Sequence, residues 1–185
     1  MKFLSLLRHA KSDWSAPQEG GQMVRDYDRP LNRKGEQAAC AMGDWIAKEK
    51  IIFDYVLASP ATRVQQTINF FENGYGRALN PHWDKRIYLA SSVTLIDLIS
   101  QIDDAPVHVL MVGHNPGLED IILDLVKQNS QSPLRDEVEQ KYPTASFATI
   151  KLDIDNWADI ENGNAQLTQF MRPRDVDAKF GPEYD

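Results

Sequence analysis

The chain has 185 residues, of which 42% are hydrophobic and 25% are charged, and its formal net charge is -7. This length and composition suit a soluble globular protein, and the acidic balance argues against nucleic-acid binding, which needs a basic surface. No apolar run approaches the roughly 20 residues that span a bilayer, so no membrane partner is expected. The single cysteine, Cys40, excludes an internal disulfide and favours a cytoplasmic location.

Strand-like and helix-like segments alternate along the chain. Apolar runs predict strands near Lys2–Leu7, Tyr55–Ala58 and Val107–Val112. Apolar residues at helical spacing predict a first helix that begins after Asn32 as its N-cap and ends near Lys48. This alternation is typical of an α/β fold with a largely parallel sheet.

Three more helices are predicted before the last third of the chain. The Ser59-Pro60 pair predicts the start of a second helix, whose first turn carries Arg63. A third helix follows the serine pair that begins at Ser91, and the Asn115-Pro116 pair predicts the cap and start of a fourth. The second and fourth helices therefore follow predicted strands directly, which is where α/β proteins place functional groups.

The last third of the chain is less regular. Residues 127–141 are polar without clear periodicity and are expected to form a loop or a frayed helix. Ser146–Leu152 and Ala165–Met171 predict an antiparallel pair of strands at one edge of the sheet. We expect one domain over residues 1–175 and a flexible charged tail over residues 176–185.

Three arginines are candidates for binding a phosphoryl group. A phosphoryl group in transfer spreads negative charge over its oxygens, so its catalyst needs fixed cations and hydrogen-bond donors. The guanidinium of arginine is always charged and can bind two oxygens at once. Arg8 follows the first strand, Arg29 lies in Asp28-Arg29-Pro30-Leu31, and Arg63 lies in the predicted second helix. Taken alone, each arginine is more often a surface residue.

Two histidines at predicted strand ends are candidates for catalysis. His9 without a proton can attack phosphorus and form a phosphohistidine that water hydrolyses. Nearby arginines would lower its pKa, and a backbone carbonyl would fix its tautomer. His114 would donate a hydrogen bond to the phosphoryl oxygens, and its neighbours Gly113 and Asn115 are candidates for substrate binding.

The remaining titratable residues suggest neither a metal site nor a general acid. The four histidines lack metal-ligand spacing, and no Walker or glycine-rich nucleotide loop is present, so no metal and no cofactor are expected. For His82 and His108 we favour a structural role. Three carboxylates lie near the motifs, namely Asp26, Asp28 and Glu119. Each is equally well explained as a cap or a solvated charge, so no acid is assigned.

Taken together, these motifs resemble the histidine phosphatase superfamily, over nearly the whole chain. The whole chain is most similar to the SixA-type phosphohistidine phosphatase branch. The resemblance implies a phosphoglycerate mutase-like fold, a three-layer α/β/α sandwich with a mainly parallel mixed sheet. Ala10 stands where the family's Arg-His-Gly motif usually has glycine, as in other SixA-like members.

The resemblance also implies roles for the motif residues. His9 is implied as the nucleophile, with Arg8, Arg63 and His114 as further catalytic residues. Arg29 is implied to bind the phosphate.

We favour a metal-independent phosphatase that acts on phosphohistidine in a protein, for example a phosphorelay component. An imidazole leaves more readily than an alkoxide, so the missing general acid favours phosphoramidate over ester hydrolysis. One alternative is a phosphatase of small phosphate esters. A non-catalytic, phosphate-dependent binding module is the alternative from another class, but both histidines and all three arginines of the motifs are retained.

Overall fold

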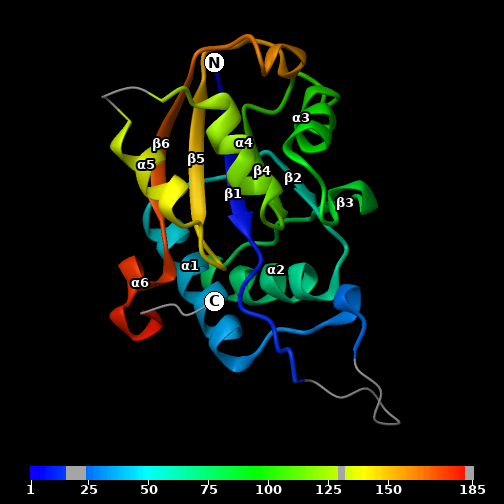
Figure 1. Ribbon diagram of the computed structural model, residues 1–185, viewed down its shortest axis with the longest axis vertical. Coiled ribbons are helices and arrows are strands. Elements are labelled where there is room, and N and C mark those ends of the chain that lie inside the picture. The colour runs from blue at the N-terminus through cyan, green and yellow to red at the C-terminus, as the bar shows by residue number, and fades with distance from the viewer. Residues whose placement is uncertain (16–23, 129–131, 182–185) are drawn as a thin grey trace.

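A computed structural model describes residues 1–15, 24–128 and 132–181, which form a mixed sheet flanked by helices (Figure 1). The strands are β1 (Lys2–Arg8), β2 (Tyr55–Ala58), β3 (His82–Trp83), β4 (His108–Gly113), β5 (Phe147–Leu152) and β6 (Ala165–Met171). Their order in the sheet is β3-β2-β4-β1-β5-β6, with parallel pairing from β3 to β1 and antiparallel pairing of β5 and β6. The predicted mainly parallel sheet with an antiparallel edge is confirmed.

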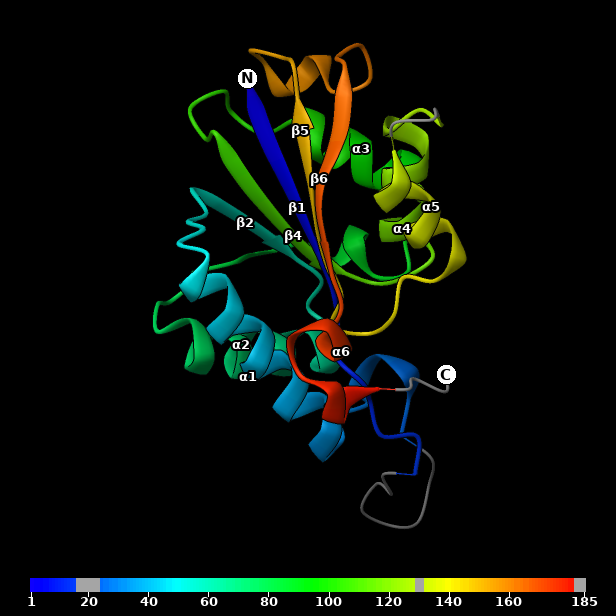
Figure 2. The same cartoon turned by 90° about the vertical axis from the view of Figure 1, so that its left-hand side faces the viewer.

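Helices cover both faces of the sheet. They are α1 (Arg33–Lys48), α2 (Thr62–Tyr75), α3 (Ser92–Ser100), α4 (Gly117–Leu125), α5 (Pro133–Gln140) and α6 (Pro173–Val176). Figure 2 shows α1 and α2 on one face and α3, α4 and α5 on the other. No helix within the described ranges is long and apolar enough to cross a membrane.

Each face of the sheet has its own core, because successive side chains of a strand point to opposite faces. In β4, Val109 and Met111 belong to the core that includes α3 and α4. Leu110 and Val112 belong to the core that includes α1 and α2. These two cores account for the three-layer α/β/α arrangement that the family resemblance implies.

Helix α1 begins as predicted, with the side chain of Asn32 accepting a hydrogen bond from the backbone nitrogen of Gly35 at 2.8 Å. The prediction for α4 is wrong at its cap. Pro116 holds the N-cap position, and the Asn115 side chain donates to the carboxylate of Glu119 instead. The Oδ1 atom of Asn115, which would have to accept a backbone hydrogen bond to cap the helix, has no hydrogen-bond partner in the described ranges.

The polar segment over residues 127–141 contains a helix, α5, rather than only a loop. Val138 of this helix is completely buried against the core that includes α4. Burial of this side chain stabilises a helix that the sequence pattern does not reveal, because apolar area is removed from water. Residues 129–131 of the segment lie outside the described ranges.

The predicted flexible tail is also partly ordered. It begins at the end of α6 and continues into a 3-10 turn at Ala178–Phe180. The Phe180 side chain is only 2% exposed and packs in the core that includes α1, which anchors this part of the chain. Residues 182–185 lie outside the described ranges.

The parallel strands bring the strand-end residues of the sequence motifs to one edge of the sheet. Strand pairing aligns Arg8 of β1 with Gly113 of β4, so His9 and His114 leave the sheet side by side. Ser59 follows β2, which pairs with β4 on its other side. Carboxyl ends of neighbouring parallel strands are where α/β proteins bind ligands.

Candidate active site

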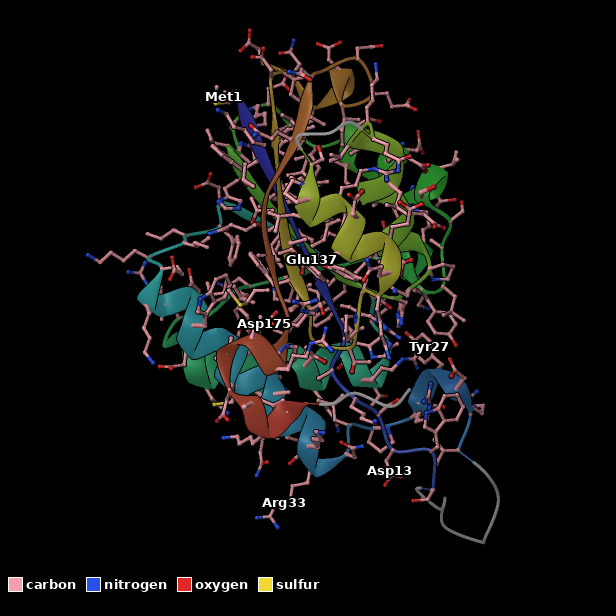
Figure 3. The ribbon with its side chains drawn as sticks, turned by 60° about the vertical axis from the view of Figure 1, so that its left-hand side comes forward. Met1, Asp13, Tyr27, Arg33, Glu137 and Asp175 are labelled. Atoms are coloured by element: carbon pink, nitrogen blue, oxygen red, sulfur yellow. The ribbon has the colours of Figure 1, made fainter. Side chains whose placement is uncertain are left out.

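A pocket of about 520 Å³ lies at this edge of the sheet. It is lined by Arg8, His9, Lys11, Ser12, Trp14, Asp26, Arg29, Arg63, Leu89, His114, Asn115 and Thr144. Figure 3 shows Asp13 and Tyr27, from the two segments that border the pocket, at one end of the molecule and Met1 at the other. Of the residues predicted for the site, Gly113 alone does not line it. The space beside its Cα is taken by Ile87 and Leu118.

His9 is held as a neutral imidazole. Its Nδ1 lies 2.9 Å from the carbonyl oxygen of Ala10. A carbonyl only accepts, so Nδ1 carries the proton and Nε2 keeps its lone pair. Burial lowers the pKa of His9 well below its ordinary value, and the neighbouring His114 and Arg63 lower it further. The ring therefore has the protonation state that a nucleophile needs.

His114 faces His9 across the pocket, with ring centroids 5.2 Å apart. Burial lowers the pKa of His114 to about 3, with a further contribution from the charge of Arg63, so the ring is neutral near pH 7. Its Nε2 lies 2.8 Å from the hydroxyl of Ser59, and its Nδ1 is buried without a hydrogen-bond partner in the described ranges. When Ser59 donates to Nε2, Nδ1 carries the proton of the neutral ring.

Arg29 and Arg63 are buried and share the carboxylate of Asp26. Oδ1 accepts a hydrogen bond from Nη2 of Arg29 at 2.7 Å, and Oδ2 accepts one from Nη2 of Arg63 at 3.0 Å. Nη1 of Arg63 also donates to the backbone carbonyl of Asp26 at 2.6 Å. The hydroxyl of Tyr88 donates to Oδ2 at 2.5 Å. Two arginines from distant parts of the chain are thereby joined.

Arg29 has two further contacts from the segment that follows β1. Its Nη1 donates to the hydroxyl of Ser12 at 2.6 Å, and its guanidinium lies 3.5 Å from the ring centre of Trp14. The backbone nitrogen of Asp13 donates to the carbonyl of Pro30 at 2.8 Å, so the two segments are also joined through their backbones. Arg29 is thus tied to the chain that carries His9.

Arg8 and Asn115 are tied to one carbonyl, that of Tyr142. Nη1 of Arg8 donates to it at 2.8 Å and Nδ2 of Asn115 at 3.2 Å. The buried Tyr142 hydroxyl donates to the carbonyl of Leu6 at 2.8 Å, which fixes this residue against β1. Tyr142 follows the unpatterned segment of the sequence, so no periodicity signals its role.

Asp26 is an anion in this pocket and cannot serve as a general acid near pH 7. Burial raises the pKa of Asp26, but hydrogen bonds from Tyr88 and Arg29, together with Arg63, lower it to about 2. A carboxyl with this pKa holds no proton to give at neutral pH.

The other two carboxylates near the motifs do not line the pocket. Asp28 forms an ion pair with the exposed Arg25 at 2.7 Å. Burial raises the pKa of Glu119, but its Oε2 accepts a hydrogen bond from Asn115 at 2.9 Å. Of the three carboxylates that lie near the motifs, Asp26 lines the pocket but is ionised, and Asp28 and Glu119 do not line it. None of them is therefore in a position to donate a proton in the pocket.

Thr67 of α2 supports the turn that follows His9, and sequence analysis does not assign it this role. Its hydroxyl accepts a hydrogen bond from the backbone nitrogen of Ala10 at 2.9 Å and donates to the carbonyl of Arg63 at 2.6 Å. A polar residue at a buried helix position is the signal that could have indicated it.

The two other histidines lie outside the pocket. Nε2 of His108 is 2.8 Å from the hydroxyl of Ser5, and the ring of His82 stacks on Tyr55 with centroids 4.4 Å apart. Within the described ranges, no group of three or more histidine, cysteine or acidic side chains is arranged to hold a metal ion.

Comparisons with known proteins agree with this geometry. The family model of the histidine phosphatase superfamily (branch 1) matches residues 4–87. The uncharacterized protein MT1313 of Mycobacterium tuberculosis is 31% identical over 169 residues, which cover 91% of this chain and 100% of that protein.

Two solved structures of SixA proteins are similar over almost the whole chain. The structure from Nakamurella multipartitia has a TM-score of 0.78 at 26% identity and covers 93% of this chain and 96% of its own. The structure from Agrobacterium tumefaciens has a TM-score of 0.74 at 27% identity, with coverages of 93% and 98%.

Proposed function

The chain belongs to the histidine phosphatase superfamily, and from this premise we propose that it removes the phosphoryl group from phosphohistidine in a protein. The observation that carries the proposal is the state of His9. Its Nδ1 is tied to a carbonyl, and its Nε2 is unprotonated in a pocket lined by Arg8, Arg29 and Arg63. We place this activity in the cytoplasm, which the lone Cys40 supports.

The reaction proceeds in two balanced steps. In the first, the Nε2 lone pair of His9 forms a bond to phosphorus while the P–N bond to the substrate histidine breaks. That histidine carries a proton on its other ring nitrogen and therefore leaves as a neutral imidazole. In the second, water attacks phosphorus, the bond to Nε2 breaks, and inorganic phosphate leaves. The water supplies its hydroxyl to phosphate and its other proton to the solvent, so His9 is released as a neutral imidazole with its proton on Nδ1 and its lone pair on Nε2. Arginines and His114 stabilise the charge on the phosphoryl oxygens in both steps.

Two features of the pocket support phosphohistidine as the substrate. The pocket's carboxylate, Asp26, is ionised, and an imidazole leaving group needs less help from an acid than an alkoxide does. The pocket also carries two exposed apolar side chains, Trp14 and Leu89, which are 76% and 53% exposed. A protein surface can cover such side chains, whereas a small polar ester cannot.

Trapping the intermediate tests the role of His9. A protein labelled with ³²P on histidine is mixed with the enzyme, quenched within milliseconds and separated by size. We expect an acid-labile, alkali-stable label on the enzyme, absent in His9→Ala and present in His82→Ala, whose histidine lies outside the pocket. Failure to trap a label during turnover, or a label that persists in His9→Ala, contradicts the assignment.

A comparison of substrates tests whether the enzyme prefers an imidazole or an alkoxide as the leaving group. We expect kcat/KM for the phosphorylated protein to exceed that for glycerol phosphates and sugar phosphates at equal ionic strength, since this ratio reports differential stabilisation of the transition state. A clear preference for an ester would identify the protein as a phosphatase of small molecules instead.

A further inference from the structure

The carboxylate of Asp26 joins side chains from three parts of the chain. It binds Arg29 from the segment before α1, Arg63 from the first turn of α2 and Tyr88 from the turn before α3. Asp26 is also the one carboxylate among the described residues that line the pocket. A single anion in a pocket for a phosphoryl anion needs a physical explanation, because like charges repel.

Hydrogen-bond capacity shows that the carboxylate leaves both guanidiniums able to bind substrate. A guanidinium has five N–H donors. Arg29 uses Nη1 for Ser12 and Nη2 for Asp26, whereas Arg63 uses both Nη atoms for Asp26. The buried Nε of each arginine has no hydrogen-bond partner in the described part of the chain. Both arginines are therefore anchored and still have donors to offer.

The negative charge of Asp26 opposes phosphate binding, whereas its hydrogen bonds hold Arg29 and Arg63 in place for it. The pocket is lined by four cationic side chains, those of Arg8, Lys11, Arg29 and Arg63. An ionised carboxylate among them reduces the attraction that the pocket exerts on any phosphate, the product included. Anchoring and charge thus have separable effects on catalysis and on phosphate binding.

We propose that Asp26 is a positioning residue that orients Arg29 and Arg63 for the transition state while it weakens the binding of free phosphate. The proposal rests on the proposed function of the same pocket. It assigns a role to a residue that the sequence offered only as one of three carboxylates near the motifs. The fixed guanidiniums stabilise the transferred phosphoryl group, and weaker phosphate binding favours release of the product.

Asp26→Asn tests the proposal because it keeps the shape of the side chain and removes its charge and one acceptor. We expect kcat to fall by about 10- to 100-fold, the scale that follows from misplacing catalytic groups. We expect the inhibition constant of inorganic phosphate to fall as well, by about threefold or more, because the pocket becomes more positive. This split between a slower reaction and tighter phosphate binding is specific to the proposed role.

Two further variants separate charge from position. Asp28→Asn removes one negative charge from the same 3-10 turn, Asp26–Asp28, outside the pocket, and should change kcat and the phosphate constant by less than about twofold. Asp26→Glu keeps the charge but moves the carboxylate. The inhibition constant of inorganic phosphate should therefore stay close to its native value, while kcat remains low.

A double-mutant cycle tests whether Asp26 acts through Arg29. The effect of Asp26→Asn on kcat should be smaller in an Arg29→Ala background than in the native one, because part of what the carboxylate orients is already missing. Equal effects of Asp26→Asn on kcat in both backgrounds would show that Asp26 does not act through Arg29. Thermal unfolding of each variant shows that the comparison is made between folded proteins.

Two results would overturn the proposal as a whole. An unchanged or higher kcat in Asp26→Asn would show that the carboxylate only competes with phosphate for the arginines. A lower kcat with weaker phosphate binding and a lower unfolding temperature would show a purely structural role. Inorganic phosphate and p-nitrophenyl phosphate serve as probes, so the test stands even where phosphohistidine is not the substrate.

Discussion

The backbone turn after His9 depends on one hydroxyl, that of Thr67. It accepts the hydrogen bond of the Ala10 nitrogen, and Ala10 in turn provides the carbonyl that fixes the tautomer of His9. All three residues are buried. The tautomer of His9, the proposed nucleophile, therefore rests on a contact between the turn after β1 and α2 that involves no charged group.

Thr67→Val removes this hydroxyl without changing the volume of the side chain. We expect kcat to fall by about tenfold with little change in KM, because the Ala10 peptide loses its partner. We also expect a loss of stability of about 1–3 kcal/mol, the usual effect of leaving a buried donor unsatisfied. Steady-state kinetics and urea denaturation measure both. Thr67→Ser retains the hydroxyl and should keep kcat close to the native value. An equal loss of kcat in the two variants would contradict the role of the hydrogen bond.

At the scale of elements, α1 and α2 approach each other closely enough to require glycine. A β-carbon at Gly43 of α1 would lie 2.0 Å from the carbonyl oxygen of Phe71, and one at Gly74 of α2 would lie 2.0 Å from that of Cys40. At the start of α1, a β-carbon at Gly35 would lie 2.2 Å from the carbonyl oxygen of Lys11. The helix pair thus packs by backbone contact and borders the segment that follows His9.

Gly43→Ala gives a test in which two effects have opposite signs. Helix propensity alone predicts that alanine stabilises α1 by about 1 kcal/mol. The contact with Phe71 predicts instead a loss of more than about 2 kcal/mol, because backbone atoms cannot move aside as a flexible side chain does. Urea denaturation measures the sign. Gly76→Ala, where a β-carbon meets nothing within 4 Å but φ is 72°, should cost less, about 1 kcal/mol. A more stable Gly43→Ala would contradict the close packing.

For the whole molecule, buried histidines predict a loss of stability in mild acid. Burial lowers the pKa of His9 well below its ordinary value, that of His108 to about 4 and that of His114 to about 3. In the unfolded chain, these groups take up protons as the pH falls through about 6.5. The unfolded state then binds more protons than the folded state, so the free energy of unfolding falls with falling pH.

Between pH 7 and 5.5 we expect this free energy to decrease by about 1 kcal/mol for each of the three histidines. Urea denaturation at the two pH values measures the total. His108→Gln, which lies outside the pocket, should remove about a third of the dependence and retain activity. A free energy that stays constant over this range would show that the histidines titrate equally in both states.

The sequence by itself determined the order of most elements and the strand ends that carry the candidate site residues. Apolar runs and helical spacing are local properties, so β1, β2, β4 and the first four helices could be predicted within a few residues. Because parallel strands place their carboxyl ends together, the positions of His9 and His114 at one edge followed from the same pattern. The ordered α5 and the buried Phe180 did not follow, since neither segment shows a periodic apolar pattern.

Only the tertiary structure decided which polar groups meet. From the sequence, Asp26 could be a cap, a solvated charge or an acid, and nothing local distinguishes these. The approach of Arg63 and of Tyr88, which is 62 positions away, makes Asp26 an ionised partner of two arginines that line the pocket. Tyr142 meets Arg8 across 134 positions in the same way. Hydrogen-bond partners and buried charges depend on how elements that are distant in the sequence pack together. Local residue patterns carry no information about which of these distant residues come into contact.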